Sequence, residues 1–433
     1  MIRLLVLLLG ASACLFADFE VSGHADLESQ VYKTQQDNKN SNSFTLKQVL
    51  EVEYAKEDLS LFSKVYAQAA YHDFLNDVED TGRTFARLDE LYLKYELEDS
   101  SIKIGKSIRF WGSLELENIV DVFNPNELQD DLFATNPLGV WNASYSYYTD
   151  SGELSIVVKV NEPNQKMANY PYVYYVFPQA VLYDETLKTS KNKNQPSVYL
   201  SYNGTTDAEY ALDFAFIYEH GYDSQRYFSQ TAPTSYVQNA YIVDKFMTYN
   251  TLVIGNTLLK LEALYAIVDD AELISDYSHI AVGVEHAFAD FEDGSTLGFL
   301  YEYYKYTTYE DNKYTDLELF QSMQDDLFVG LRYALNNADA TEFVGGIVHD
   351  LEYDEQTYYG ELNTRLGESL KLTLDYYYIE PSKKRANSLR TFRKTPKNGF
   401  EYCVLLLNQH KLTLLKRQLI VLYVNKITYF RNY

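Results

Sequence analysis

The sequence predicts an all-β protein, a transmembrane antiparallel β-barrel of about 18 strands (roughly 16 to 18). Apolar and polar residues alternate along about seventeen segments, which is the period of a strand with one face in lipid. Short polar turns and long polar loops separate these segments in regular succession. After the first residues, no run approaches the ~18 apolar residues of a membrane helix, and a chain that crosses a bilayer without helices must close into a barrel.

Residues 1–17 have the pattern of a secretory signal peptide. A single early charge at Arg3 precedes an apolar stretch and the small residues before Ala17. Cleavage after Ala17 would place the first strand almost at the mature N-terminus. Lipid attachment at Cys14 is the alternative. Cleavage would remove Cys14 and leave only Cys403, so no disulfide is expected within the mature chain.

The barrel is predicted over residues 18–380, and its first strand shows the pattern most clearly. Phe19, Val21 and Gly23 lie on one face of this strand, which runs to about residue 32. The 42 tyrosines fit a barrel because a tyrosine ring can lie in lipid while its hydroxyl contacts water. Further strands are predicted in order over residues 44–54, 59–69, 91–95, 102–110, 198–202, 212–218, 280–288, 297–303, 327–335 and 370–378.

The connections alternate in length, as expected when all short turns lie on the periplasmic side and all long loops lie outside. The long connections are predicted at residues 33–42, 72–83, 112–136, 161–195, 219–238, 268–278 and 307–325. The short turns are predicted at residues 56–58, 98–100, 149–152, 203–204, 255–256, 293–294 and 336–337. About seventeen strands end near Ile379, and a single-chain bacterial barrel needs an even number, so one closing strand should follow.

Residues 381–433 form an atypical basic tail. They contain twelve Lys and Arg against the single acid Glu401, a net charge of +11, so the overall −25 leaves −36 for the first 380 residues. The run Val404–Leu407 breaks the period of two. One hypothesis is a frame-shifted end in which the closing strand is lost or poorly specified, and the alternative is a genuine basic periplasmic extension.

The acidic body makes nucleic acid an unsuitable partner and favours contact with cations. The sequence contains no Gly-x-Ser-x-Gly, His-Glu-x-x-His, cysteine pair or phosphate-binding loop, so we do not expect an enzyme. No cofactor and no specific metal site are predicted.

One strand and the connection after it carry the candidate pore-lining residues. Lys103 and Arg109 share the strand face opposite Ile104, so both cations should point into the lumen. The connection 112–136 is acidic and contains no Lys or Arg. Folded inward, it would make a cation-attracting constriction facing the two cations; left outside, it would be a solvated acidic loop. The pore-lining candidates are Lys103, Arg109, Glu115, Glu117, Asp121, Asp130 and Asp131.

The connection around residues 170–178 is too apolar to extend freely into water. Folded into the lumen, it would form a plug or an aromatic-lined path. The alternatives are a strand extension above the membrane or a subunit contact. The plug candidates are Tyr172, Tyr174, Tyr175 and Phe177.

The stretch with Gly105-Lys106, Trp111-Gly112 and residues 121–125 (Asp-Val-Phe-Asn-Pro) resembles a family. These motifs are similar to Gram-negative outer-membrane β-barrel porins of unknown substrate, related to alginate-export-type and exporter-associated barrels. The resemblance is clearest over residues 85–148 and looser over 18–380. It implies transport across the outer membrane and assigns no substrate-binding residue.

The predicted function is therefore an outer-membrane channel for small polar or amphipathic solutes, because a barrel of this size leaves a water-filled lumen. Two alternatives are a conduit for hydrophobic or lipid-like molecules working with a periplasmic exporter, and a non-conducting surface barrel. The expected location is the cell outer membrane, and the expected partners are its lipid and lipopolysaccharide and an unidentified small solute. A homo-oligomer and a periplasmic exporter are further candidate partners.

Overall fold

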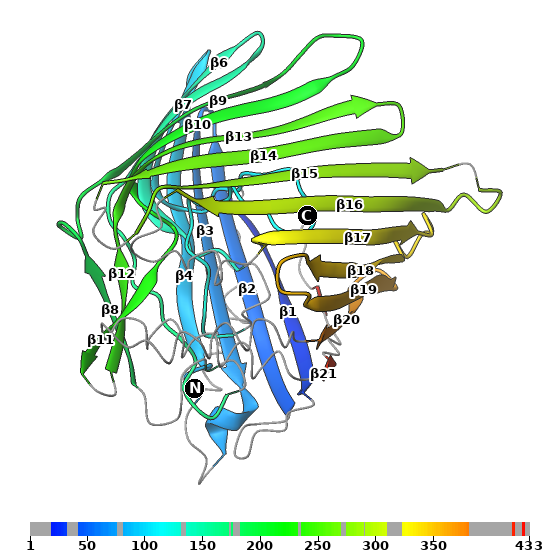
Figure 1. The fold of residues 1–433 in the computed structure, drawn as a ribbon, viewed down its shortest axis with the longest axis horizontal. Coiled ribbons are helices and arrows are strands. Elements are labelled where there is room, and N and C mark those ends of the chain that lie inside the picture. Colours follow the sequence, from blue (N-terminus) through cyan, green and yellow to red (C-terminus); the bar gives the residue numbers. More distant parts are fainter. Residues whose placement is uncertain are drawn as a thin grey trace.

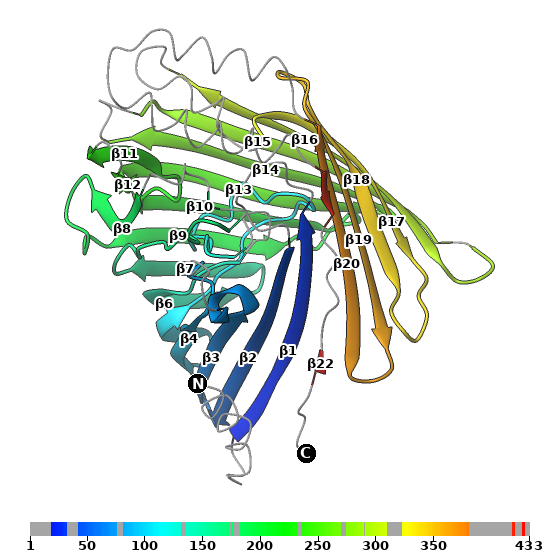
Figure 2. The same ribbon diagram turned by 90° about the horizontal axis from the view of Figure 1, so that it is seen from below.

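A computed structural model describes residues 19–32, 42–75, 81–130, 136–172, 175, 182–232, 235–269, 274–289, 291–309, 323–380, 418–420 and 427–428. In this part of the chain nineteen strands form one antiparallel sheet, which curves around a central space (Figure 1, Figure 2). The fold is all-β, as the alternating pattern predicted. No helix in the described residues is both long enough and apolar enough to cross a membrane.

The long strands of this sheet pair with their neighbours along the chain, apart from two excursions. They are β1 (Phe19–Tyr32), β2 (Asn42–Lys56), β3 (Leu59–Ala70), β4 (Phe85–Glu96), β5 (Ser100–Ser107), β6 (Val140–Thr149), β7 (Gly152–Lys159), β9 (Ser197–Thr205), β10 (Leu212–Tyr222), β13 (Ile242–Ile254), β14 (Thr257–Val268), β15 (Tyr277–Phe288), β16 (Thr296–Thr308), β17 (Asp325–Ala334), β18 (Glu342–Asp350), β19 (Gln356–Leu366) and β20 (Leu370–Glu380).

The two excursions form a small second sheet beside the first. Strand β8 (Leu182–Thr189) lies in the connection between β7 and β9, and β11 (Tyr227–Ala232) and β12 (Ser235–Ala240) lie between β10 and β13. Strand β12 pairs antiparallel with β11 and parallel with β8. A short 3₁₀ helix, η2 (Tyr71–Phe74), follows β3.

Two short pieces of the basic tail lie between the first and last long strands. β21 (Gln418–Ile420) and β22 (Ile427–Thr428) both pair with β1 and with β20. Ile420 pairs with Val31, and Ile427 pairs with Ala25. The two tail residues are seven positions apart, and their partners on β1 are six positions apart. The frame-shift hypothesis for residues 381–433 stays a prediction, which sequencing of the gene tests.

The alternation of short and long connections holds, with two local corrections. The strand predicted over residues 102–110 ends at Ser107, so Arg109 lies in the connection after β5 and not on the strand face with Lys103. The tight turns at Glu57-Asp58 and Gly255-Asn256 lie where the sequence predicted them. The turn predicted at Asn203-Gly204 is wrong, because both residues lie within β9 and Gly204 pairs with Gly152 of β7. The connection to β10 is instead formed by residues 206–211.

The strands expose one face and bury the other over much of the barrel. On β16, Phe299 and Tyr301 point outward and are 48% and 46% exposed, whereas Leu300, Glu302 and Tyr304 point inward and are buried. An exposed aromatic face fits hydrocarbon and its interface, and a polar inner face fits a lumen. The pattern on β16 therefore places lipid outside the ring of strands.

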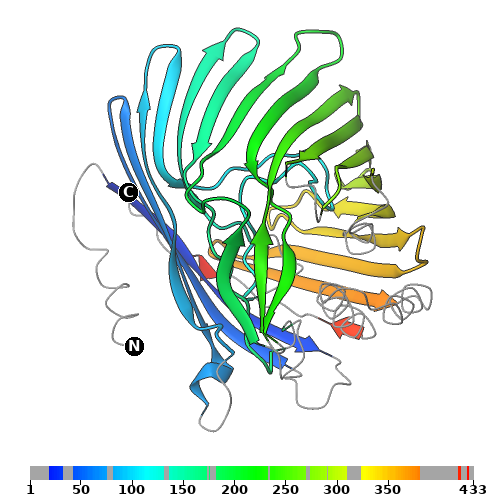
Figure 3. The same ribbon diagram turned by 60° about the vertical axis from the view of Figure 1, so that its left-hand side comes forward.

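The main hydrophobic core lies inside the barrel, between the inner wall and the connection that follows β5. Trp111, Val120 and Phe123 of this connection pack against inner-face residues of β6, β7, β9, β10 and β13–β16. Figure 3 shows the cyan segment that follows β5 inside the ring of strands. The connection 112–136, as far as it is described, thus folds inward rather than into external solvent.

Candidate pore constriction

We call residues 108–130 the inward segment, and its first anchor lies beside β5. Asn124 Oδ1 accepts a hydrogen bond of 2.8 Å from Arg109 N–H, and Asn124 Nδ2 donates to the carbonyls of Ser107 at 3.3 Å and Leu138 at 2.7 Å. One buried amide therefore joins both ends of the excursion. The asparagine of the Asp-Val-Phe-Asn-Pro motif is the residue that returns the chain to the wall.

The second anchor is Glu262, a fully buried carboxylate on the inner face of β14. Its Oε1 accepts hydrogen bonds from the backbone N–H groups of Ser113 at 2.6 Å and Leu114 at 3.3 Å, and its Oε2 accepts one from Val120 at 3.4 Å. Hydrogen bonds to a charged acceptor are about twice as strong as neutral ones. Glu262 therefore fixes a tight turn of the inward segment on the far wall.

The third anchor is a pair of residues on β16. Glu302 accepts hydrogen bonds from the N–H groups of Glu115 at 2.6 Å and Leu116 at 3.0 Å. Tyr304 donates its hydroxyl proton to Glu302 at 2.6 Å and accepts from Glu117 N–H at 3.1 Å. The backbone of three successive residues is thus held by two inner-wall side chains.

The side chain of Glu115 extends the contact to β17. Its carboxylate lies 2.6 Å from Arg332, whose guanidinium also lies 3.4 Å from Glu342 and 3.8 Å from Glu285. Three acids therefore surround one cation, and the local charge is negative unless a further cation approaches. Lys260, 3.1 Å from Glu285, supplies part of that compensation.

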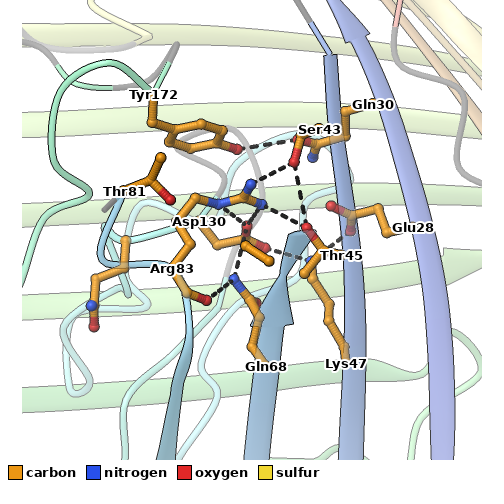
Figure 4. Close-up of polar contacts among 12 residues, drawn as sticks. Glu28, Gln30, Ser43, Thr45, Lys47, Gln68, Thr81, Arg83, Asp130 and Tyr172 are labelled. Atoms are coloured by element: carbon orange, nitrogen blue, oxygen red, sulfur yellow. Dashed lines mark hydrogen bonds and ion pairs between the residues drawn. The ribbon is translucent and has the colours of Figure 1, made fainter. Parts of the chain in front are cut away.

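The fourth anchor is a buried ion cluster at the loop ends of β1, β2 and β3 (Figure 4). Asp130 of the inward segment forms an ion pair with Arg83, whose Nε lies 3.0 Å away, and another with Lys47 at 2.5 Å. Lys47 also lies 2.5 Å from Glu28 of β1. Gln68 of β3 donates to Asp130 at 3.3 Å and to the carbonyl of Arg83 at 3.0 Å.

A tyrosine from the next long connection covers this cluster. The ring centroid of Tyr172 lies 3.9 Å from the guanidinium carbon of Arg83, and its hydroxyl donates to Gln30 of β1 at 3.1 Å. Tyr172 is buried, and so is Tyr175, whose backbone N–H donates to the carbonyl of Tyr172 at 3.1 Å. The other two plug candidates, Tyr174 and Phe177, lie outside the described residues.

A second buried ion cluster fills the opposite inner wall. Lys245 of β13 lies 2.9 Å from Asp223 and 3.5 Å from Glu219. Tyr277 donates to Asp223 at 2.6 Å, and Tyr199 donates to Glu219 at 2.9 Å. The carboxylates here are matched by a cation and by hydroxyl donors, so this wall is compensated without solute.

Lys103 and Arg109 differ from these paired cations. Within the described residues, neither has an acid oxygen within 4.0 Å. Lys103 Nζ lies 4.9 Å from the ring centroid of Tyr92, and the guanidinium carbon of Arg109 lies 5.9 Å from that of Phe123. Both approach aromatic faces, which attract a cation without neutralising its charge.

Burial raises the pKa of two acids in the inward segment. The pKa of Asp121 rises to about 6, opposed by a hydrogen bond from Trp111 N–H. The pKa of Glu127 rises to about 7, through burial and then through the neighbouring Asp130 carboxylate. Burial would also raise the pKa of Asp130, but Lys47 and Arg83 outweigh it and hold that pKa well below its usual range.

The structure places the predicted pore residues at separate points of the wall, in different surroundings. Glu115 and Glu117 lie against β16 and β17, Asp130 is buried, Asp121 is half-buried, and Asp131 lies outside the described residues. Glu262, Glu302 and Arg83 were missed, because an acid or a base on an inner face looks like any other until the loop that meets it is known. No group of acids, histidines and cysteines in the described residues is arranged to hold a metal ion.

Comparison with known proteins identifies the fold. No protein-family description and no curated protein sequence matches the chain. Among solved structures, a BenF-like porin from Pseudomonas fluorescens aligns with a TM-score of 0.54 at 9% identity, over 96% of this chain and 99% of the other. The outer-membrane protein OpdK from Pseudomonas aeruginosa aligns with a TM-score of 0.54 at 8% identity, over 96% and 100%. OccD3 (OpdP) from the same species aligns with a TM-score of 0.52 at 9% identity, over 96% and 92%.

These similar structures are porin barrels, and the alignments span nearly the whole of each chain. At such low sequence identity the likeness is one of fold. The chain therefore has the fold of an outer-membrane porin.

Proposed function

We propose that the protein is an outer-membrane channel that passes small polar or amphipathic solutes by diffusion through a narrowed lumen. The porin fold supports this proposal, as does the outward aromatic and aliphatic face that suits the lipid of the outer membrane and its lipopolysaccharide. The inward segment supplies the narrowing, because it crosses from β5 to β14 and β16 and returns toward β1–β3.

One observation supports the route of the solute above all others. The inner faces of β9, β10 and β13–β16 are buried beneath the inward segment, as Tyr199, Lys245 and Glu262 illustrate. The inner faces of β1, β3, β19 and β20 instead remain partly exposed along most of their length, for example at His24 and Glu361. Water and solute would therefore pass along β19, β20 and β1–β5, beside the inward segment and not through it.

The charge along this route favours cations over anions. Glu53 is exposed on the inner face of β2, and Glu51 forms an ion pair of 3.1 Å with Lys64. Arg332, the cation beside the constriction, is outnumbered by Glu115 and two other acids. Fixed charge of one sign in a narrow passage attracts counterions and repels ions of the same sign. Lys103 and Arg109 lie at the other edge of the constriction and limit the preference without reversing it.

The solute itself is proposed only as a class. A structure that aligns with this chain at a TM-score of 0.50 and 11% identity is that of OpdK with vanillate, a small organic molecule. The passage proposed here has both charged and aromatic side chains, including the stacked pair Phe62 and Tyr92 with ring centroids 5.3 Å apart. Such a lining accepts small molecules that combine a polar group with an apolar body.

Single-channel recording in planar bilayers tests this proposal. Refolded full-length protein should give discrete conductance steps, and the reversal potential across a salt gradient should take the sign of cation preference. Unfolded protein in the same detergent is the control for detergent artefacts. Inserted protein that never conducts would mean a non-conducting barrel, and a reversal potential of the opposite sign would mean that Lys103 and Arg109 control the passage.

A further inference from the structure

We propose that Asp130 is a positioning residue, which holds three separate long connections against the wall of β1–β3 and so sets the width of the channel. This inference rests on the proposed channel function. It gives Asp130 a role different from that of a pore-lining acid. Its charge would act on the protein and not on the solute.

The surroundings of Asp130 isolate it from the lumen. The residue is 1% exposed, and its two oxygens face Arg83 and Lys47. With Glu28 as the partner of Lys47, two acids and two bases balance within the cluster. A balanced, buried set of charges has little field at a distance, so it cannot select ions.

Arg83 makes the cluster a junction. Its guanidinium donates to Asp130, to Ser43 and, at 3.2 Å, to Thr45, while its backbone N–H donates to Asp73 at 3.1 Å. Asp73 also accepts from Thr81 N–H at 2.8 Å. Asp73 therefore holds the backbone of the same residue whose guanidinium binds the inward segment.

Tyr172 brings in the third connection, between β7 and β9. Its ring covers Arg83 and its hydroxyl reaches Gln30. A ring stacked on a guanidinium is held more firmly when an acid fixes that guanidinium from the other side. Loss of Asp130 would therefore loosen Tyr172 as well, although Asp130 and Tyr172 belong to different connections.

The position of the cluster links it to the solute route. Glu28 pairs in register with Thr45 on β2, and Lys47 pairs with Gln68 on β3. These inner-face positions lie on the strands whose remaining inner faces are partly exposed. The cluster thus stands at the long-loop end of the proposed passage, and release of the connections there would change its cross-section.

The test compares the single-channel currents of the full-length protein and its D130N variant. Removal of one partner from a buried charge pair leaves the other charges uncompensated and is strongly disruptive. We expect conductance about two-fold higher than that of the unmodified protein, with frequent transitions between levels, because current scales with the open cross-section. D130E keeps the charge and should restore steady currents close to the original level. Asp58→Asn, in an exposed turn at the other end of β2, is the matched loss of one acid and should leave the currents unchanged.

The outcomes separate the alternatives. Steady currents of unchanged size in D130N would overturn the proposal, and so would a change of ion selectivity with unchanged conductance, which would make Asp130 a solute-facing charge. Should D130N fail to show the gel shift of a folded barrel on boiling, Tyr172→Leu takes its place. This change removes the ring over Arg83 and the hydroxyl bonded to Gln30, and it leaves the ion pairs of Asp130 in place. Unchanged, steady currents in that variant would equally overturn the proposal. An unmodified protein that inserts without conducting would instead contradict the channel function itself.

Discussion

Replacement of Glu262 by Gln changes the constriction at one atom and gives a calculable effect. In the native protein the carboxylate accepts three backbone hydrogen bonds of 2.6, 3.3 and 3.4 Å from the inward segment. A glutamine side chain keeps one acceptor oxygen and turns an N–H₂ group toward backbone donors that it cannot bind. In the variant, the remaining hydrogen bonds therefore have a neutral acceptor, and at least one of the three hydrogen bonds is lost.

The magnitude follows from the difference between charged and neutral hydrogen bonds. A bond to a charged group contributes about 1.5–3 kcal/mol, against about 1 kcal/mol for a neutral one. Summed over the three donors, and measured at a pH at which the Glu262 carboxylate is ionised, E262Q should weaken the seating of the inward segment by roughly 2–4 kcal/mol. Because about 1.4 kcal/mol corresponds to a tenfold change, the ratio of seated to released segment should fall by roughly 30-fold to 1000-fold.

Single-channel recording measures this ratio through the time spent in a second, larger conductance level. E262Q should visit that level, and Glu53→Gln should not, because Glu53 is an exposed acid on β2 and its loss removes the same charge without touching the inward segment's anchors. Identical dwell times in the two variants would refute the reasoning. That result would mean that the apolar contacts of Trp111 and Phe123 hold the segment without help from Glu262.

Three further predictions follow from the same geometry. Burial raises the pKa of Asp121 to about 6 and that of Glu127 to about 7, above the usual carboxyl range. The stability that these groups contribute is therefore complete at acidic pH and is lost as the pH rises through the raised values. Transitions between current levels should increase from pH 5 to pH 8, and a flat profile would contradict this. R109Q removes a cation that has no ion-pair partner among the described residues. The reversal potential should then show a stronger cation preference, and the melting temperature should be unchanged. A shift toward anion preference would count against the proposed route. Deletion of residues 418–433 should abolish the heat-dependent gel shift, because β21 and β22 are the described links between β20 and β1, and a truncated chain that still shifts would show that closure does not need them.

Sequence patterns predicted the strands well because lipid on one side and water on the other impose a period of two that local residues must obey. They failed at Asn203-Gly204, where a typical turn pair lies inside β9 because its neighbours on β7 and β10 continue the ladder past it. The acids of residues 112–136 were visible in the sequence, but their partners were not. Ser113 and Glu262 are 149 positions apart, and Arg83 and Asp130 are 47 apart, and nothing local records such pairings.

The anchors of the inward segment also impose an order on biogenesis. Residues 113–120 are synthesised and exported well before β14 and β16, which supply Glu262 and Glu302 from 142 to 187 positions further along the chain. Contacts at such separation form late, after the intervening chain has been brought into place. An unfinished barrel would therefore have a wide, unobstructed interior, and its narrowing would be completed only when the later strands join the growing sheet. A factor that inserts this protein would thus bind an open curved sheet in which the inward segment is not yet anchored to the wall.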